Sequence, residues 1–249
     1  RDPSDVIGGK LPFIGRNGRV GKSDTMVCEA CEYVDTFLQL HPAFSIILNI
    51  DGDHLDYFGT LDNIIKSFHQ FCLQTSGCIL VNGDNENAMR AVAGITHAKI
   101  LTFGRSASCD YCVSELNEED TACEDFTIMH GDERVCRVNL HVPGEHNMMN
   151  ALAAAAAAHY FGVDGAHIKT ALEAFTGVHP RFEVLGKFDG VTVADDFAHH
   201  PTELSSVLSS AMRMGYHAVW AIFQPHTYWR TAMLLDDFAA ALTIHDDVV

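Results

Sequence analysis

Residues 44–81 decide the fold class, because two apolar runs of strand length flank a stretch with helical periodicity. The first run is FSIILN at 44–49, and the second is CILV at 78–81. Nearly continuous apolar strands are typical of a parallel sheet that helices cover on both faces. Between the two runs, apolar side chains recur over residues 61–72 at the spacing of one helix face. The order strand, helix, strand predicts an α/β fold.

The same alternation extends to both sides of this segment. A strand at 25–30 precedes it, and a helix at 85–93 follows it. Alternating strands between 100 and 142, with a hairpin turn at Gly131-Asp132, predict an antiparallel edge to the sheet. Later expected elements are helices at 147–161 and 164–175, a boundary loop at 177–180, strands at 183–188, 191–194 and 218–223, and helices at 202–214 and 229–242. These residues predict a mostly parallel sheet with flanking helices, followed by a second, partial α/β domain.

The composition argues against several classes of partner. The chain has 249 residues with 16 Lys and Arg against 33 Asp and Glu, which gives a formal net charge of −17. A chain this acidic lacks the basic surface that attracts nucleic acid or anionic lipid, so neither is an expected partner. No apolar run reaches the ~18 residues of a membrane-spanning helix. An anionic substrate would then need a local positive site or a divalent cation.

The eight cysteines bear on the cellular compartment. Two pairs, Cys28/Cys31 and Cys109/Cys112, have the spacing C-x-x-C, which suits a zinc site if four ligands come together. Cys28 lies in an apolar run, where a free cysteine behaves as a small hydrophobic residue, so we expect reduced thiols rather than zinc. Reduced thiols without a disulfide framework are typical of the cytoplasm, the compartment we expect.

Both ends of the chain are expected to lie within a longer protein. The chain begins with Arg1-Asp2-Pro3 rather than Met, and no basic segment followed by an apolar one marks a signal peptide. Residues 247–249 read as the start of another strand. We therefore expect a fragment of a longer protein.

A loop rich in acidic side chains follows the strand at 44–49. It contains Asp51, Asp53, His54 and Asp56. Hard divalent cations take oxygen ligands and accept a single imidazole, so this loop is a candidate metal site. Glu32 would lie beside it if the strands at 25–30 and 44–49 are neighbours. The alternative is that these residues only cap the next helix or form a turn.

A second candidate site lies where the Ala-rich helix begins. The chain reads PGEHN at 143–147, and Asn150 follows on the same helix face as Asn147. N–H groups at a helix start and paired side-chain amides can bind a phosphate or a purine edge. The alternative is that Asn147 is a simple N-cap, and the residues alone do not decide between the two.

A third cluster follows the strand at 191–194. Its side chains are Asp195, Asp196, His199, His200 and Glu203. Carboxylates and imidazoles between a strand end and a helix start form a typical catalytic or metal-binding set. Arg181 before the cluster and Arg230 after it add positive charge. A metal-dependent hydrolase could use such a set, so the cluster alone does not define a reaction.

One motif is misleading. The stretch GRNGRVGKS at 15–23 resembles a phosphate-binding P-loop, but that motif requires Gly where this chain has Arg16. A P-loop also leads into a helix, whereas a strand is expected at 25–30. We therefore predict a surface turn at 15–23.

Six motifs in order resemble the Mur ligases, from about residue 2 to the end. They are EACE at 29–32, NIDGDHLD at 49–56, GEHNMMN at 144–150, RF at 181–182, DDFAHHPTE at 195–203 and FQPH at 223–226. Their order and spacing are most similar to the branch that joins L-alanine to UDP-N-acetylmuramate. The resemblance implies a central ATP-binding domain at 1–181 and a partial Rossmann-like domain at 182–249.

The resemblance also implies roles for side chains. Glu32 and His54 would bind Mg²⁺ near the γ-phosphate of ATP. The residues expected to bind the nucleotide are His146, Asn147, Asn150, Arg181 and Asp196. The expected catalytic residues are His199, Arg230 and Arg181. His199 and Arg230 would contact UDP-N-acetylmuramate or its acyl phosphate, and Arg181 and Arg230 would supply positive charge for phosphoryl transfer. The chain departs from the family pattern at Phe197, where Tyr is common, and at Thr227, where Arg is common.

The reaction implied is formation of an amide bond in peptidoglycan precursor synthesis, through an acyl phosphate made with ATP. The family's P-loop precedes the position of Asp2, so we expect this chain to be inactive by itself. Two alternatives stay open. One is a hydrolase that uses Asp53, His54, His199 and His200, and the other is a noncatalytic piece whose apolar faces await further domains.

Overall fold

A computed structural model describes residues 2–11, 15–117, 124–178, 181–243 and 247–248. The chain forms two compact units, which we call the middle unit, residues 31–175, and the terminal unit, residues 1–30 and 176–249. Each unit is described by itself. The proposed domain boundary between 181 and 182 stays a prediction.

The middle unit is built on a six-stranded sheet. Its strands, in spatial order, are β4 (Phe44–Ile47), β5 (Cys78–Asn82), β6 (Lys99–Gly104), β7 (Tyr111–Asn117), β8 (Glu124–His130) and β9 (Glu133–Leu140). The first four strands pair in parallel, and β8 and β9 pair antiparallel. This arrangement confirms the predicted parallel sheet with an antiparallel edge and the hairpin at Gly131-Asp132.

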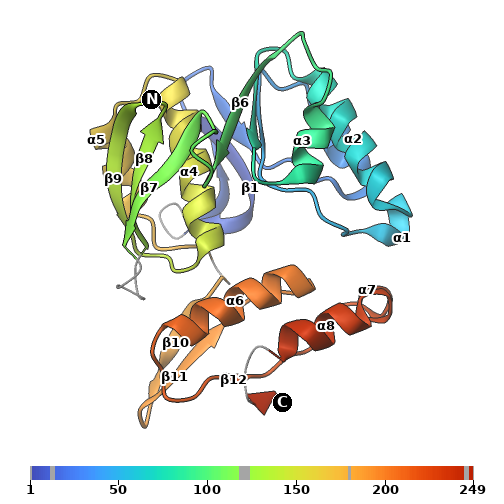
Figure 1. Cartoon of the computed structure of the whole chain (residues 1–249), viewed down its shortest axis with the longest axis vertical. Helices are drawn as coiled ribbons and strands as arrows, with labels where there is room; N and C mark the ends of the chain where they lie inside the picture. Colours follow the sequence, from blue (N-terminus) through green and yellow to red (C-terminus); the bar gives the residue numbers. More distant parts are fainter. Residues whose placement is uncertain (1, 12–14, 118–123, 179–180, 244–246, 249) are drawn as a thin grey trace. The chain divides into compact units, whose positions relative to one another are not determined.

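Helices cover this sheet, and Figure 1 shows α4 running along its strands. The helices of the middle unit are η1 (Tyr33–Gln39), α1 (Leu55–Phe58), α2 (Leu61–Gln74), α3 (Glu86–Val92), α4 (Glu145–Tyr160) and α5 (Gly165–Glu173). The N-terminus of α2 is capped by the side chain of Thr60, that of α3 by Asn85 and that of α5 by Asp164, each accepting a backbone N–H. Helix α4 packs against β6, β7 and β8, while α5 packs against β9.

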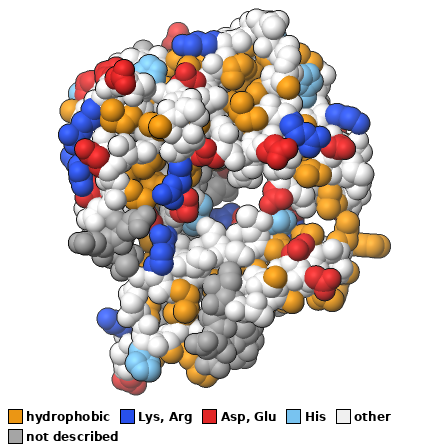
Figure 2. Space-filling view, in the orientation of Figure 1, with side chains coloured by type: hydrophobic (Ala, Val, Ile, Leu, Met, Phe, Trp, Pro, Cys, Tyr) orange, Lys and Arg blue, Asp and Glu red, His pale blue; other side chains and the backbone are white. Residues whose placement is uncertain are grey.

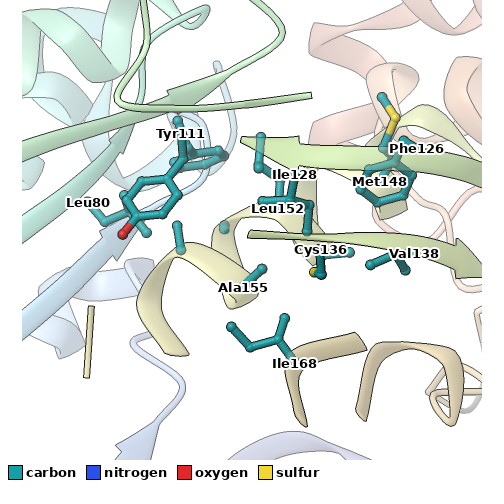
Figure 3. Packing of buried hydrophobic residues seen from close by; sticks show 14 of the residues in the cluster. Leu80, Tyr111, Phe126, Ile128, Cys136, Val138, Met148, Leu152, Ala155 and Ile168 are labelled. Atoms are coloured by element: carbon teal, nitrogen blue, oxygen red, sulfur yellow. The ribbon is translucent and has the colours of Figure 1, made fainter. Parts of the chain in front are cut away.

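One core cluster of the middle unit lies between α4 and strands β5 to β9 of the sheet. Phe126, Ile128 and Leu152 are each 0% exposed, and Met148 is 1% exposed. Figure 3 shows these side chains converging in one cluster. Small alanines of α4, such as Ala155, let the helix approach the strands closely. Close packing of this kind gives the loops at the strand ends a rigid base.

The terminal unit contains three small sheets. Its elements are β1 (Ser4–Leu11), β2 (Arg16–Arg19), β3 (Met26–Cys28), β10 (Glu183–Phe188), β11 (Val191–Asp195), α6 (Pro201–Arg213), β12 (Trp220–Ala221), α7 (Tyr228–Met233), α8 (Leu235–Leu242) and β13 (Asp247–Val248). Strand β1 lies between β2 and β3, β10 and β11 form a hairpin, and β12 pairs with β13 in parallel. The parallel pair joined through α7 and α8 agrees with a partial α/β domain.

The core of the C-terminal part is small. Leu204 and Leu208 of α6 pack against Phe238 and Ala241 of α8. Several large apolar side chains stay exposed, among them Trp220 at 65%. Few buried contacts therefore support this part of the chain.

Two predicted elements differ in the structure. Residues 15–23 were predicted to be a surface turn, but Arg16–Arg19 form strand β2, because backbone pairing with β1 overrides a sequence rich in glycine and charge. The predicted helix at 229–242 is divided into α7 and α8 at Leu234, whose φ of −114° and ψ of 27° interrupt the helix. The boundary loop predicted at 177–180 lies partly outside the described residues.

The surface agrees with the acidic, mixed composition. Figure 2 shows acidic and basic side chains interspersed over the face in view, with apolar side chains in small groups between them. Within the described part of the chain, no helix is both long enough and apolar enough to cross a membrane.

Candidate functional site

The predicted metal ligands of the middle unit lie together. Glu32 Oε1 is 3.6 Å from His54 Nε2, and Asp53 Oδ2 is also 3.6 Å from this nitrogen. Ligands of an octahedral Mg²⁺ at about 2.1 Å lie about 3 Å apart when adjacent and about 4 Å apart when opposite. The observed spacing matches neither value, and within the described residues no three of these side chains are grouped to hold an ion by themselves. Glu32 and His54 could supply two ligands of a hard divalent cation whose other ligands are water or phosphate oxygens.

The reason given for the proximity of Glu32 was wrong. Strand β3 pairs with β1, and β4 pairs with β5, so the expected pairing of the strands at 25–30 and 44–49 does not occur. Glu32 instead immediately precedes η1, where the ring of Tyr33 lies 4.6 Å from the ring of His54. The turn before η1 therefore brings Glu32 to the loop.

Aromatic and acidic side chains surround His54. The Tyr57 hydroxyl donates a hydrogen bond of 2.7 Å to Asp35 Oδ2, and Ser67 Oγ donates to Asp35 Oδ1. The hydrogen bond to the Asp35 carboxylate raises the pKa of Tyr57, with smaller contributions from burial and from the charge of Asp35. Asp35 has a φ of 55° and His54 a φ of 53°, a left-handed conformation that costs energy in residues other than glycine. Tertiary contacts must therefore hold η1 and the loop that contains His54 in these conformations.

Three asparagines supply such contacts. Asn82 Nδ2 donates to Leu48 O at 2.9 Å, and Asn87 Nδ2 donates to Ile50 O at 3.1 Å. The Ile50 N–H donates to Asn85 Oδ1 at 3.3 Å. These asparagines were not predicted as site residues. They lie at the end of β5 and the start of α3, the edge of a parallel sheet where ligands bind.

The zinc alternative finds no support. Within the described ranges, no group of three or more His, Cys, Asp or Glu side chains is arranged to hold a metal ion. The described cysteines are free, and Cys109 and Cys112 are buried. Cys28 is exposed, which corrects the expectation that it packs as a small hydrophobic residue, because β3 presents its side chains to solvent.

The start of α4 is held from two sides. Gly144, at a φ of 107°, is the N-cap, and its N–H donates to Glu124 Oε1 at 2.9 Å. Asn147 therefore does not act as the N-cap, and its Nδ2 donates to Pro143 O at 2.7 Å. Arg105 Nη1 lies 2.9 Å from Glu145 Oε1.

The predicted nucleotide residues divide between the two units. His146 and Asn150 are exposed on the first turns of α4, where they are accessible to a ligand, and Asn147 is half-buried. Arg181 and Asp196 belong to the terminal unit.

In the terminal unit, Asp196 joins two loops. Its Oδ2 accepts the N–H of Phe182 at 2.7 Å, and its Oδ1 accepts the N–H of Ala198 at 2.7 Å. Phe182 has a φ of 45°, so the first of these bonds holds a strained residue beside Arg181. Asp196 thus has a structural role in this loop.

Glu203 is the centre of a second network in this unit. Its Oε2 accepts the N–H of His199 at 2.9 Å, and its Oε1 lies 3.3 Å from Arg181 Nη1. Burial is the largest single influence and disfavours the ionised carboxyl. The hydrogen bond from His199 and the charges of Arg181 and His199 together outweigh it and lower the pKa of Glu203. The motif at 195–203 contains Glu203, but this role is visible only in the folded chain.

Aromatic rings complete this cluster. The ring of Phe197 lies 4.8 Å from that of His199 and 5.7 Å from that of His226. The guanidinium of Arg181 lies 6.0 Å from the centre of the Phe197 ring. His200 caps α6 and accepts the Thr202 N–H, so it serves the helix start. Arg230 lies on α7 and is partly buried.

This architecture defines a class of α/β protein in which loops at the carboxyl ends of parallel strands carry the functional side chains. The model of the Mur ligase middle domain matches residues 11–158, and that of the Mur ligase glutamate ligase domain matches residues 180–249. The chain therefore belongs to the Mur ligase family.

Similar proteins carry more specific names. The UDP-N-acetylmuramate–L-alanine ligase of Caldanaerobacter subterraneus subsp. tengcongensis is 40% identical over 250 residues, which cover 100% of this chain and 54% of the relative. The ligase of the same name from Lachnospira eligens is 42% identical over 251 residues, with coverage of 100% and 54%. A crystal structure of the UDP-N-acetylmuramate–alanine ligase of Thermotoga maritima matches with a TM-score of 0.80 and 28% identity, covering 99% of this chain and 54% of that chain. The chain spans about half the length of these relatives.

Proposed function

We propose that this chain is part of a cytoplasmic, ATP-dependent ligase that joins L-alanine to UDP-N-acetylmuramate. The observation that carries the proposal is the identity of 40% along the whole chain to a relative with this activity in its name. The proximity of Glu32 and His54 supports the proposal independently, because these two side chains could bind Mg²⁺. Phosphoryl transfer needs such a positive charge to neutralise the phosphate oxygens, and this acidic protein has few cations of its own.

Glu32 and His54 would hold Mg²⁺ together with water or phosphate oxygens, and Asp53 lies 3.6 Å from the imidazole. When bound, the metal ion would supply positive charge to the phosphate oxygens of ATP. Glu32 and His54 would fix where that charge lies, because the loop that carries His54 is anchored to the start of α3 by the hydrogen bonds of Ile50 with Asn85 and Asn87.

The nucleotide would bind at the start of α4. His146 and Asn150 are exposed there, and the amides of Asn147 and Asn150 suit a purine edge. Arg181 and Asp196 would contact ribose or phosphate. Asp196 would also position Arg181, because it holds the neighbouring Phe182 N–H.

The reaction has two steps. A lactyl carboxylate oxygen of UDP-N-acetylmuramate attacks the γ-phosphorus of ATP, so that the P–O bond to ADP breaks and an acyl phosphate forms. The amine of L-alanine then attacks the acyl carbon, loses a proton, and displaces phosphate to leave the amide. Arg181, His199 and Arg230 would stabilise negative charge on the transferred phosphoryl group and the acyl phosphate.

These roles describe a protein of full family length. We propose that residues 1–181 form its ATP-binding domain without the P-loop and that residues 182–249 form part of its C-terminal domain. The 249-residue chain alone would then lack turnover, because the phosphate cradle would come from elsewhere in the protein.

The test compares His54→Ala with His167→Ala in a full-length ligase that contains this sequence. His167 is a matched control, because it lies in the middle unit with a side chain 78% exposed and pairs only locally with Asp164. We expect His54→Ala to lower kcat by about 100-fold or more, about 2.7 kcal/mol of transition-state stabilisation. Turnover would be measured from the formation of ADP and of the alanyl product in the same reaction. Near-normal rates in His54→Ala would contradict the metal assignment, and hydrolysis without an alanyl product would contradict the ligase.

A further inference from the structure

Asn82, Asn85 and Asn87, which we call the asparagine clamp, hold the chain that leaves strand β4. Asn82 and Asn87 donate to the carbonyl oxygens of Leu48 and Ile50 at 2.9 and 3.1 Å. Asn85 accepts the Ile50 N–H at 3.3 Å. Both backbone polar groups of Ile50 are thereby bonded to side chains that lie more than thirty residues later in the sequence.

This contact replaces strand pairing. The parallel pairing of β4 with β5 ends at Ile47, so residues 48–50 have left the ladder of the sheet. Buried backbone groups need partners, and the side chain of Ile50 is buried at 2% exposure. The asparagine clamp satisfies the backbone of Ile50, while its side chain is enclosed by the core. Ile50 is therefore a fixed point of the loop.

The residues after Ile50 are bonded within the loop. Asp51 accepts the N–H of Gly52 through its side chain at 2.7 Å and the N–H of Asp53 through its carbonyl at 2.9 Å. The Asp53 carboxylate accepts the N–H of His54 at 2.7 Å. His54 then begins α1 in a left-handed conformation. A displacement of Ile50 would therefore be passed through this short segment to the imidazole.

We propose that the asparagine clamp is the positioning device of the metal-binding loop, with Asn87 as its principal donor. The inference rests on the proposed Mg²⁺ site at Glu32 and His54. Side chains that orient metal ligands without touching the ion typically affect metal affinity by about 10–100-fold. Asn87 fills this role because its amide reaches Ile50 from the first turn of α3, a helix that packs on β5.

The chain offers matched variants. Asn87→Asp keeps the size of the side chain and the oxygen that accepts from Arg90 at 3.5 Å, but it removes the N–H that reaches Ile50. The added negative charge favours cation binding, so a loss of affinity must come from displaced ligands. Arg90→Ala is the control on the same helix, because it removes the contacts to Asn87 and Asp62 and leaves the bond to Ile50 intact.

The experiment titrates the 249-residue chain with Mn²⁺ as a paramagnetic substitute for Mg²⁺. Broadening of the His54 ring resonance, assigned with His54→Ala, reports binding at this histidine. Thermal unfolding of each variant checks that it is folded. We expect Asn87→Asp to weaken the Mn²⁺ affinity at His54 by 10-fold or more and Arg90→Ala to change it by less than about 3-fold.

Two results would overturn the inference while leaving the metal site in place. One is an affinity for Asn87→Asp within about 3-fold of the parent chain, and the other is an equal loss in Arg90→Ala. A parent chain in which Mn²⁺ broadens other histidines but not His54 would overturn the metal assignment itself, and with it the inference. The behaviour of the parent chain therefore separates the two failures.

Discussion

The two loops that carry the candidate residues are supported in different ways. The loop of Asp53 and His54 is attached to a unit whose core contains many side chains with no exposed surface, such as Phe103 and Leu152. The loop of residues 195–203 belongs to a unit in which α6 and α8 share a small core of four buried residues. The first loop has a broad rigid base, and the second is held mainly by its own side chains.

The hydrogen bonds show the same contrast. Ile50 is bonded to Asn87, which is 37 residues away in the sequence. In the second loop, His199 is bonded to Glu203, four residues away, and Phe182 to Asp196, 14 residues away. The first site therefore depends on tertiary packing between separate elements, whereas the second is largely specified by a short motif.

The strongest predicted change in stability comes from a substitution in the core of the middle unit. Phe126→Ala should lower the free energy of unfolding of the middle unit by about 3–5 kcal/mol, because it removes a fully buried ring and leaves a cavity. Amide hydrogen exchange measured by unit would show increased exchange in α4 and β8. Phe188→Ala is the control, since its side chain is 63% exposed and should change stability by less than about 0.5 kcal/mol. Equal effects of the two variants would contradict the assignment of Phe126 to a closely packed core.

A smaller effect is expected from the local network of the second loop. Asp196→Ala should cost about 1–3 kcal/mol in local stability, because the N–H groups of Phe182 and Ala198 lose their acceptors. Exchange of these two amides should accelerate, while exchange in β5 and β6 should not change. Asp195→Ala, an exposed neighbour, serves as the control. If exchange accelerated throughout the middle unit as well, the loop would not be locally specified.

The smallest expected effect depends on pH. The lowered pKa of Glu203 means that its ionised form stabilises the folded state above the ordinary value of 4.5. This contribution is lost as the pH falls through the lower pKa of the folded state. We expect Glu203→Gln to reduce stability at pH 7 by less than about 1 kcal/mol, because the pair with Arg181 is partly exposed. The difference from the parent chain should shrink in urea unfolding below pH 4.5, and a difference that grows on acidification would contradict the assignment.

Much of the fold follows from periodicity alone. The apolar runs at 44–49 and 78–81 and the helical stripe at 61–72 correspond to β4, β5 and α2. Two differences in secondary structure have identifiable causes. Strand β2 has a sequence typical of a turn and forms a strand because its backbone pairs with β1. The helix at 229–242 is interrupted at Leu234, whose backbone is not helical.

The candidate site was only partly predictable. Strand-end position and ligand chemistry identified the His54 loop and placed Glu32 beside it, although the strand pairing assumed for Glu32 does not occur. The asparagine clamp was not predicted, because hydrogen bonds across 34–37 residues leave no periodic signal in a single sequence. The exposure of Cys28 was missed for a related reason, since an apolar run does not reveal whether anything covers its strand.

The α/β class, the antiparallel edge and the side chains able to bind a metal ion or a nucleotide follow from the sequence alone, because hydrophobic periodicity, turn residues and donor chemistry are local properties. The tertiary structure decided which of these side chains meet. Glu32 reaches His54 through the turn before η1 rather than through strand pairing, and Ile50 is fixed by amides from another element. Such contacts depend on how separate elements pack, and packing is a property of the whole unit rather than of any one segment.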